Sequence, residues 1–398
     1  MTERLYYDNA YLNEFSAVVE KIDIKGDKQI VALDRSAFYP TSGGQPYDTG
    51  TLNDLRVTDV FVDKTGEVWH EIDGKLSVGD AVNGKIDWQR RFDHMQQHGG
   101  EHMIAGAFYR LFNGMTIGLH LGAEVSSIDV ELPDGATHMS DEDIERVEDY
   151  VNQRIQEDHP VKCWFPDAVE LKQLPLRKRP TVTEHVRIVA MGDFEMVACG
   201  GTHPSSTGQI GLVKIVDASP AKGKLRVSFI CGKRAFDNYR SVYNSAWSAA
   251  NLMATRPEKL AANVESLNKK LYECERVLYA IRKEKLLSEI PSMIEKAEDL
   301  SDGGKLVSAI VEGDPALLRD LASKLIENDN VAVLLGAQNG DRYNFVFARG
   351  NALPYMMGKV LSEAAKPFGG KGGGRPDFAQ GGGAKEILEE ARKILLQV

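Results

Sequence analysis

The first ninety residues alternate short apolar runs with turn-forming residues. β-Branched and aromatic side chains gather in runs such as 29–33 and 57–62, and glycine, asparagine and aspartate separate these runs. Short runs of this kind between turn residues are typical of strands that pair with their neighbours in sequence. The pattern therefore predicts an antiparallel sheet or a small barrel over residues 1–90.

Beyond residue 90 the apolar spacing changes to three and four, which is the period of a helix. This spacing predicts a helix that begins at Asp93, as its N-cap, and runs through about Phe112. A second, acidic and amphipathic helix is expected over 141–157. Strands are expected at four further runs, namely 127–131, 186–190, 211–216 and 225–229. The mixture predicts an α+β domain over residues 91–235.

Helix formers dominate residues 236–300, where one row of apolar residues repeats at alternating spacings of four and three. The row contains Leu260, Val264, Leu267, Leu271, Cys274, Leu278 and Ile281. Such a heptad seam fits either a helical hairpin with residues 239–253 or a zipper between two copies of the chain. The sequence leaves both arrangements open, so a homodimer, formed through this helical segment or through the C-terminal domain, is one of the expectations.

The last hundred residues alternate strand-like and helix-like segments after a break at 301–304. The strand-like segments are 306–311, 331–335 and 343–348, and the helix-like segments are 316–326 and 354–365. This order predicts a separate small α/β domain over 301–398. The fold class predicted for the whole chain is α+β.

Composition and charge narrow the possible functions. The chain is 42% hydrophobic and 27% charged, as globular proteins are, and its formal net charge of −10 disfavours a surface coated in basic residues. Cations still gather at 172–179 and 222–234, where phosphates can bind, although an ordinary solvated surface explains either run equally well. No stretch approaches eighteen uninterrupted apolar residues, and the four cysteines lie far apart. We therefore expect no membrane partner and a cytoplasmic location.

Two pairs of residues have the spacing of metal half-sites. His98 and His102 lie four residues apart on the expected helix, and Cys199 and His203 have the complementary spacing in ACGGTH. One thiolate and three imidazoles suit tetrahedral zinc. The competing interpretation makes the histidines surface residues and the cysteine a core residue, but two such pairs within one domain disfavour it. His94, one turn before His98, is expected either to replace a ligand or to hydrogen-bond to one.

The segments around these pairs resemble a known family. RFDHMQQHGGEHMI and CGGTHPSSTGQIG, together with FYPTSGGQPYDTG and HLGAEVSSIDVEL, resemble the zinc motifs and flanking segments of alanyl-tRNA synthetase editing domains and of free-standing AlaX editing proteins. The resemblance spans roughly residues 1–235 and implies zinc as the cofactor. Gly99 departs from the family, in which threonine is frequent at this position, and this bears on pocket shape and not on the ligands. Glu101 directly precedes His102, so we expect it to point elsewhere and to be structural.

The glycine-rich loop TSGGQ at 41–45 offers two hydroxyls, an amide and a backbone that can approach a ligand closely. A hairpin turn is the competing interpretation. The resemblance implies that the loop contacts the amino acid and the terminal adenosine, with Thr41 and Gln45 as catalytic residues and Ser42, Gly43 and Gly44 as substrate contacts. It further implies that Thr41 reads the hydroxyl of mischarged serine, so that alanine is spared.

The segment FGGKGGGRPDFAQGGG at 368–383 combines glycines that expose backbone amides with the cations Lys371 and Arg375. These features suit contacts to phosphate or sugar. A flexible linker is the alternative, but linkers seldom contain an Arg-Pro-Asp-Phe core. The segment resembles the glycine-rich motif of the DHH-associated domain of alanyl-tRNA synthetase, which implies tRNA as the partner.

With the resemblance, four parts are expected along the chain: a β-rich barrel-like domain with the glycine-rich loop at 1–90, a zinc-dependent editing domain at 91–235, a helical hairpin or coiled coil at 236–300 and a DHH-associated-type tRNA-binding domain at 301–398. The implied function is hydrolysis of mischarged tRNA(Ala), with seryl and glycyl esters as substrates. The alternative is a nucleic-acid-binding protein with a structural zinc and no hydrolytic activity. A closed four-ligand site without an adjoining cleft would indicate that alternative.

Overall fold

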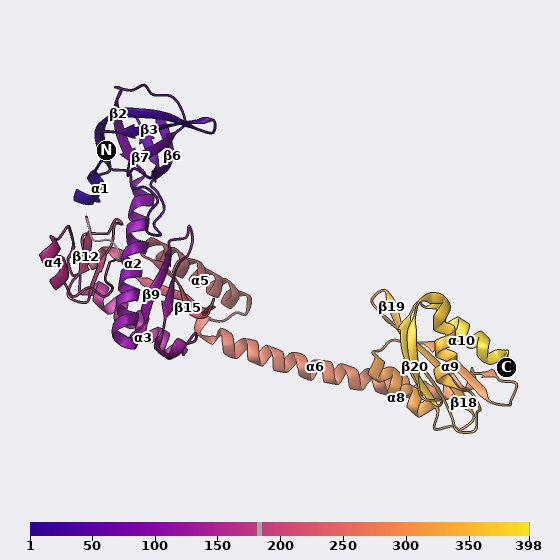
Figure 1. The fold of residues 1–398 in the computed structure, drawn as a ribbon. Helices are drawn as coiled ribbons and strands as arrows, with labels where there is room; N and C mark the ends of the chain where they lie inside the picture. The colour runs from indigo at the N-terminus through magenta and orange to yellow at the C-terminus, as the bar shows by residue number, and fades with distance from the viewer. Residues whose placement is uncertain (181–184, 398) are drawn as a thin grey trace. The chain divides into compact units, whose positions relative to one another are not determined.

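The computed structural model describes residues 1–180 and 185–397, and the chain divides into two compact units, Met1–Ser248 and Ala249–Val398 (Figure 1). Both units combine helices with largely antiparallel sheets, which confirms the predicted α+β class. The division into four parts stays a prediction. No helix within the described ranges is long and apolar enough to span a bilayer.

Six strands close into a barrel in the order β2-β3-β7-β6-β5-β8, as expected for the first ninety residues. Their bounds are β2 Glu14–Lys25, β3 Lys28–Leu33, β5 Gly50–Leu52, β6 Leu55–Val62, β7 Val68–Ile72 and β8 Ala81–Ile86. Alternate side chains of β8 are buried, as the two-residue period of a strand requires, and Phe38 and Leu52 help to fill the interior. The short segments β1 (Glu3–Arg4), α1 (Leu5–Asp8) and β4 (Arg35–Ser36) complete this part, with β1 parallel to β4.

Helix α2 (Trp88–Phe112) follows the barrel directly and begins earlier than predicted. Its N-cap is Asp87, whose side chain accepts a hydrogen bond from the Arg90 amide at 3.2 Å. The predicted start at Asp93 was wrong because the first turn is mostly polar and carries no apolar period. Asp93 lies within the helix, and its carboxylate instead forms an ion pair with Arg234. The helix ends where Asn113 adopts a left-handed conformation with φ 52°.

Two antiparallel sheets and helix α3 surround α2. The four-stranded sheet has the order β14-β15-β10-β9, and the three-stranded sheet has the order β11-β12-β13. The bounds are β9 Met115–His120, β10 Ser126–Glu131, η1 Pro133–Gly135, α3 Asp141–Gln156, β11 Val161–Trp164, α4 Ala168–Gln173, β12 Ile188–Met191, β13 Glu195–Ala198, η2 Thr207–Ile210, β14 Val213–Ala221, β15 Lys224–Cys231 and α5 Lys233–Leu252. Met103, Phe108 and Val151 lie in the core that α2 and α3 share with the larger sheet.

The second unit contains a six-stranded sheet with the order β16-β17-β18-β19-β21-β20. The bounds are η3 Pro257–Lys259, α6 Leu260–Ser288, α7 Ile290–Glu295, β16 Glu298–Asp299, β17 Lys305–Ile310, α8 Pro315–Leu325, β18 Val331–Asn339, β19 Arg342–Arg349, α9 Met357–Ala365, η4 Lys366–Phe368, β20 Lys371–Gly374, β21 Phe378–Gly383 and α10 Glu386–Leu396. Helices α9 and α10 cover one face of the sheet and α8 covers the other (Figure 1). Both faces are apolar, since successive residues of β18 such as Val333 and Leu334 point to opposite faces and both are buried.

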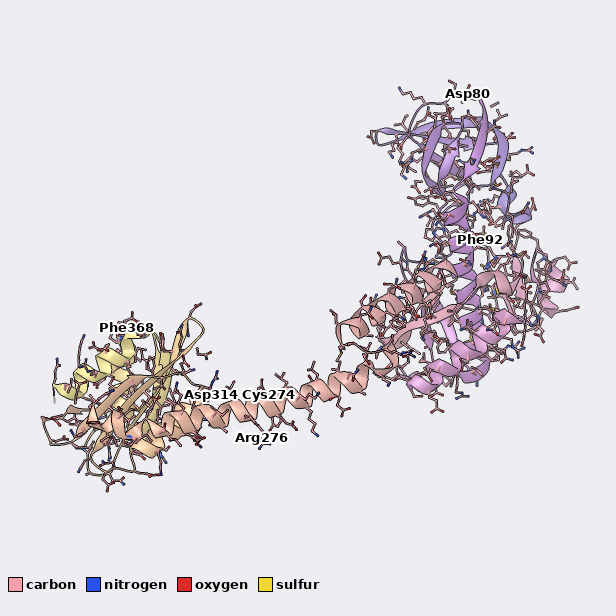
Figure 2. The ribbon with its side chains drawn as sticks, turned by 180° about the vertical axis from the view of Figure 1, so that it is seen from behind. Asp80, Phe92, Cys274, Arg276, Asp314 and Phe368 are labelled. Carbon is pink, nitrogen blue, oxygen red and sulfur yellow. The ribbon has the colours of Figure 1, made fainter. Side chains whose placement is uncertain are left out.

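The apolar seam predicted from the heptad pattern lies on the surface of α6. Leu267 and Leu271 are 58% and 56% exposed, and Cys274 is exposed as well (Figure 2). The C-terminal part of the helix is anchored to α8, where Asp320 accepts from Tyr279 at 3.0 Å and from Lys283 at 2.6 Å. The zipper between two copies of the chain stays a prediction.

Candidate metal centre

Helix α2 and the loop after β13 bring four potential metal ligands together. His98 and His102 project from one face of α2 because they are four residues apart, while Cys199 and His203 flank a tight glycine-containing turn. One ligand atom from each residue lies within 4.8 Å of the others. The Cys199 Sγ is 3.4 Å from His98 Nε2 and 3.3 Å from His203 Nε2. The two half-sites predicted from the sequence therefore meet.

The charges of this group favour cation binding. Burial raises the pKa of the Cys199 thiol, but the neighbouring imidazoles outweigh burial and hold that pKa well below its usual range. Burial lowers the pKa of His203 to about 3, so its ring is neutral and offers a lone pair. Burial also acts to lower the pKa of His102, but the nearby Cys199 thiolate outweighs burial and raises that pKa to about 10. A thiolate is thus available to a metal ion, and binding would displace the His102 proton.

Unpartnered ring nitrogens show that the group fits a metal. Both ring nitrogens of His102 and the Nδ1 of His203 are buried without a hydrogen-bond partner. The nearest carboxylate oxygens, from Glu101 and Glu195, stay 3.8 and 3.9 Å from the His102 ring nitrogens. A buried polar group left unpaired costs about 1–3 kcal/mol, and a cation removes that deficit at the nitrogens that face it. These residues can hold a metal ion.

Gln45 lies behind His98 and fixes the orientation of its ring. The fully buried Gln45 side chain accepts from His98 Nδ1 at 2.8 Å and from the Thr202 amide at 3.1 Å, and its Nε2 donates to Thr202 Oγ1 at 2.8 Å. This leaves His98 Nε2 directed at Cys199. Gly201 permits the close approach, because a Cβ there would lie 2.1 Å from the His98 ring. The geometry assigns Gln45 a positioning role; the catalytic role expected from the sequence stays a prediction.

A cleft of about 290 Å³ is lined by three of the four potential ligands, His98, His102 and Cys199, and by part of the glycine-rich loop. Ser42 and Gly43 line it. Gly44 turns away with φ +86°, where a Cβ would meet the Leu119 carbonyl at 2.7 Å. Thr41 is exposed beside this lining, and its Oγ1 accepts from the Tyr47 amide at 3.2 Å. The loop is both a tight turn, closed by the Ser42 and Gln45 backbones, and a wall of the cleft.

A buried ion pair connects the segment after this loop to helix α2. The Arg91 side chain from α2 pairs with Asp48, and both are fully buried. Arg91 also donates to the carbonyl of Ala10 at 2.8 Å and to that of Ala37 at 2.6 Å. The pair therefore links the segment that follows the loop to α2. Removing either partner would leave an uncompensated buried charge, which is strongly destabilising. Sequence reasoning missed this pair because only the fold brings the two residues together.

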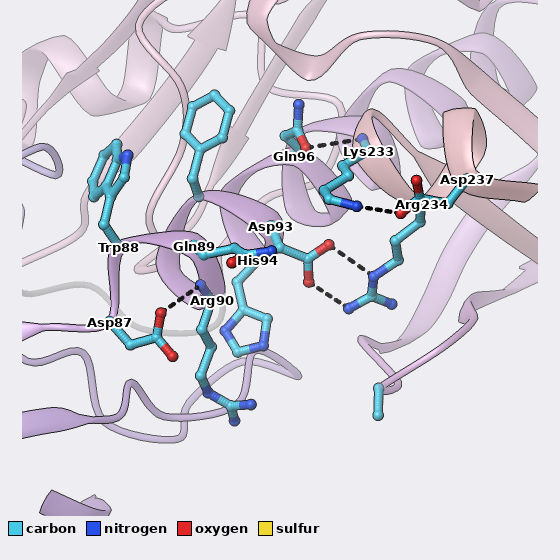
Figure 3. A pocket seen from close by; sticks show the side chains of 12 residues that line it. Asp87, Trp88, Gln89, Arg90, Asp93, His94, Gln96, Lys233, Arg234 and Asp237 are labelled. Carbon is cyan, nitrogen blue, oxygen red and sulfur yellow. Dashed lines mark hydrogen bonds and ion pairs between the residues drawn. The ribbon is translucent and has the colours of Figure 1, made fainter. Parts of the chain in front are cut away.

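The structure adds two cleft residues and separates others from it. Thr116 of β9 lines the cleft with a buried Oγ1 that has no partner, and Glu101, expected to be structural, lines it as well. His94 lies outside the four-ligand group, in another cavity of about 630 Å³ (Figure 3). Lys371 and Arg375 belong to the second unit, on β20 and the turn after it, and both are exposed.

Three segments of the chain match known sequence families. Residues 2–90 match the family described as tRNA synthetases class II (A), and residues 186–228 match the threonyl and alanyl tRNA synthetase second additional domain. Residues 302–398 match the DHHA1 domain. The barrel, the four-ligand group and these matches define a class of proteins assembled from alanyl-tRNA-synthetase-type accessory domains.

The chain belongs to the family of alanyl-tRNA editing proteins of the AlaX-L type. It is 30% identical over 398 residues to the alanyl-tRNA editing protein AlaX-L of Pyrococcus horikoshii, a match that covers 96% of this chain and 94% of that protein. It is also 33% identical over 419 residues to an alanine–tRNA ligase of Pyrococcus furiosus and 31% identical over 418 residues to that of Archaeoglobus fulgidus. Each ligase match covers 99% of this chain but only 44% and 43% of the ligase, so the chain spans less than half of these relatives.

Proposed function

We propose that this protein is a zinc-dependent hydrolase that removes wrongly attached amino acids from tRNA(Ala). The observation that carries the proposal is the four-ligand group opening onto a cleft, in a chain that matches an AlaX-L editing protein over nearly its whole length. A set of one thiolate and three imidazoles is typical of zinc. When bound, zinc would polarise an ester carbonyl or lower the pKa of a water molecule.

The protein's own residues would orient the ester. Gln45 holds the His98 ring, and the 42–43 wall of the cleft offers backbone and hydroxyl groups to the aminoacyl moiety. Thr41 is proposed to read the seryl hydroxyl, because its Oγ1 uses only its acceptor capacity within the protein and can still donate. Lys371 and Arg375 are proposed to contact the tRNA backbone.

The alternative, a structural zinc in a nucleic-acid-binding protein, predicts a closed site without a cleft. The adjoining 290 Å³ cleft and the unpartnered Thr116 hydroxyl in its wall favour the hydrolase. A cleft with an unsatisfied polar group in its wall suits a polar ligand better than a purely structural metal site does.

The test compares tRNA(Ala) charged with serine, glycine or alanine. We expect release of serine and glycine and sparing of alanine, with loss of activity after chelation and recovery on addition of zinc. Equal release of all three amino acids would contradict the editing function. Full activity in metal-free protein would contradict the role of zinc.

A further inference from the structure

Glu101 is a buried carboxylate in the wall of the metal cleft, and the function proposed above gives it no role. Its position directly before His102 predicts a structural residue that points elsewhere, yet its side chain lines the cleft and the residue is only 5% exposed. Its Oε2 lies 3.8 Å from His102 Nε2. The carboxylate therefore faces the same space as the four-ligand group.

No described residue satisfies the hydrogen-bonding capacity of this carboxylate. Over residues 1–180 and 185–397, nothing donates a hydrogen bond to the Glu101 side chain, and its one ion-pair contact is the 3.8 Å approach to His102. That distance is too long for a hydrogen bond. In the proposed function, moreover, a nitrogen of His102 that binds the metal carries no proton to donate. A buried carboxylate without donors is unfavourable, so Glu101 suits a ligand that brings donors into the cleft.

Glu195, the other buried carboxylate near His102, provides the contrast. It is 3% exposed, and the Nε of Arg177 donates to its Oε1 at 2.9 Å and to its Oε2 at 3.1 Å. The described residues that line the cleft do not include it. Of the two carboxylates, Glu195 is thus satisfied within the protein, while Glu101 is open to a ligand.

The other charges of the cleft indicate which ligand group Glu101 suits. Among the described residues of the cleft wall, Arg177 and Lys178 are cations, and Glu101 is the one carboxylate. The Cys199 thiolate also lines the cleft, but it belongs to the four-ligand group. An aminoacyl ester brings a free α-ammonium group, which both cations and a bound metal ion would repel. A carboxylate in contact with the ammonium offsets this repulsion, and hydrogen bonds between charged groups are roughly twice as strong as neutral ones.

We infer that Glu101 binds the free α-ammonium group of the aminoacyl ester and thereby selects aminoacyl-tRNA over RNA esters whose amino group is acylated, such as peptidyl-tRNA. The inference rests on the proposed function for the identity of the ester. The cleft of about 290 Å³ is close to the lower limit of the range usual for small-molecule sites, which suits one aminoacyl group better than a peptide. Because seryl, glycyl and alanyl esters carry the same ammonium group, this contact orients the ester without distinguishing its side chain.

The test titrates the full zinc-loaded chain with two non-hydrolysable analogues, in which an amide joins the acyl group to 3′-amino-3′-deoxyadenosine. One analogue carries a seryl group, and the other carries a 3-hydroxypropanoyl group, which lacks only the ammonium. We expect the wild type to bind the seryl analogue roughly tenfold more tightly, since hydrogen bonds to charged groups are stronger than neutral ones. Glu101→Gln should lose most of this preference, and Glu101→Asp, which keeps the charge, should retain part of it.

Glu124→Gln is the matched control. It removes the same charge from an exposed residue that is not among those lining the cleft, and it should leave the preference unchanged. Hydrolysis gives a second readout: seryl-tRNA(Ala) should be cleaved faster than N-acetylseryl-tRNA(Ala), and Glu101→Gln should narrow this difference. Zinc content should be equal in all variants.

Equal binding of the two analogues by the wild type, or an equal loss of affinity for both in Glu101→Gln, would overturn the ammonium contact. Loss of zinc from Glu101→Gln would make Glu101 a metal ligand instead, and slower hydrolysis with unchanged analogue binding would assign it to proton transfer. The proposed function is judged separately. Hydrolysis of seryl-tRNA by a wild type that binds both analogues equally refutes only this inference, and discrimination between the analogues without hydrolysis refutes only the editing reaction.

Discussion

At the scale of single residues, the Gln45 amide is the contact that connects the glycine-rich loop to the metal ligands. Gln45→Leu keeps a similar volume but removes the acceptor for His98 Nδ1. Loss of such an outer hydrogen bond typically weakens metal affinity by about 10–100-fold. We therefore expect weaker zinc binding in a chelator competition, with Gln45→Glu, which keeps an acceptor, closer to the wild type. Unchanged zinc affinity in Gln45→Leu would contradict the positioning role and leave the catalytic role expected from the sequence as the remaining prediction.

The two threonines beside the cleft give a test of selectivity. Thr41→Val should reduce seryl-tRNA cleavage by a few-fold to roughly tenfold, because one neutral hydrogen bond contributes about 0.5–1.5 kcal/mol. Glycyl-tRNA cleavage is the internal control, since glycine has no hydroxyl. Thr116→Val is the matched variant, because its Oγ1 has no partner in the protein. A serine-specific loss in Thr116→Val alone would move the contact to β9, and equal loss of both substrates in Thr41→Val would show that Thr41 supports the loop.

The sequence predicted the group of four residues that the fold brings together, because its members lie at short spacings: four residues apart on a helix and four residues apart around a turn. It could not identify Thr116 or the partners of Gln45, since these depend on which strands meet at α2. His94 shows the same limit. Its spacing resembles that of a ligand, but the α2 helix places it in a different cavity from the metal centre.

At the scale of elements, α2 is constrained by its close contact with β15. A Cβ on Gly100 would lie 2.1 Å from the Sγ of the fully buried Cys231. Alanine is the better helix former by about 1 kcal/mol, but overpacking typically costs about 1–3 kcal/mol. Gly100→Ala should therefore lower the unfolding temperature, and adding Cys231→Ala, which removes the clashing sulfur, should restore part of it. A Gly100→Ala variant as stable as the wild type would show that this contact is loose.

Element boundaries were less predictable than element types. The barrel and the small C-terminal sheet follow from alternating apolar runs. The start of α2 does not, because its cap at Asp87 depends on a local hydrogen bond followed by a polar first turn.

At the scale of the whole molecule, the proposed function requires the chain to bind tRNA despite its formal net charge of −10. Lys371→Ala combined with Arg375→Ala should weaken tRNA binding and lower the slope of its salt dependence by roughly one to two units, as expected for two lost phosphate contacts. Turnover at saturating tRNA should persist. Lys324→Ala combined with Lys393→Ala removes the same charge from exposed positions of the same unit and should change binding little. Abolished turnover with intact binding would contradict this division of labour.

The central claim, that the four-ligand group carries metal-dependent editing, is tested most directly by measuring zinc content and seryl-tRNA(Ala) hydrolysis on the same preparations of wild-type and Cys199→Ser protein. The thiolate lies within hydrogen-bonding distance of His98 and His203, and serine supplies a much weaker ligand of similar size. We predict that zinc content and hydrolysis fall together, while the unfolding transition of the second unit is retained. A Cys199→Ser protein that lacks zinc but hydrolyses seryl-tRNA at the wild-type rate would contradict the account.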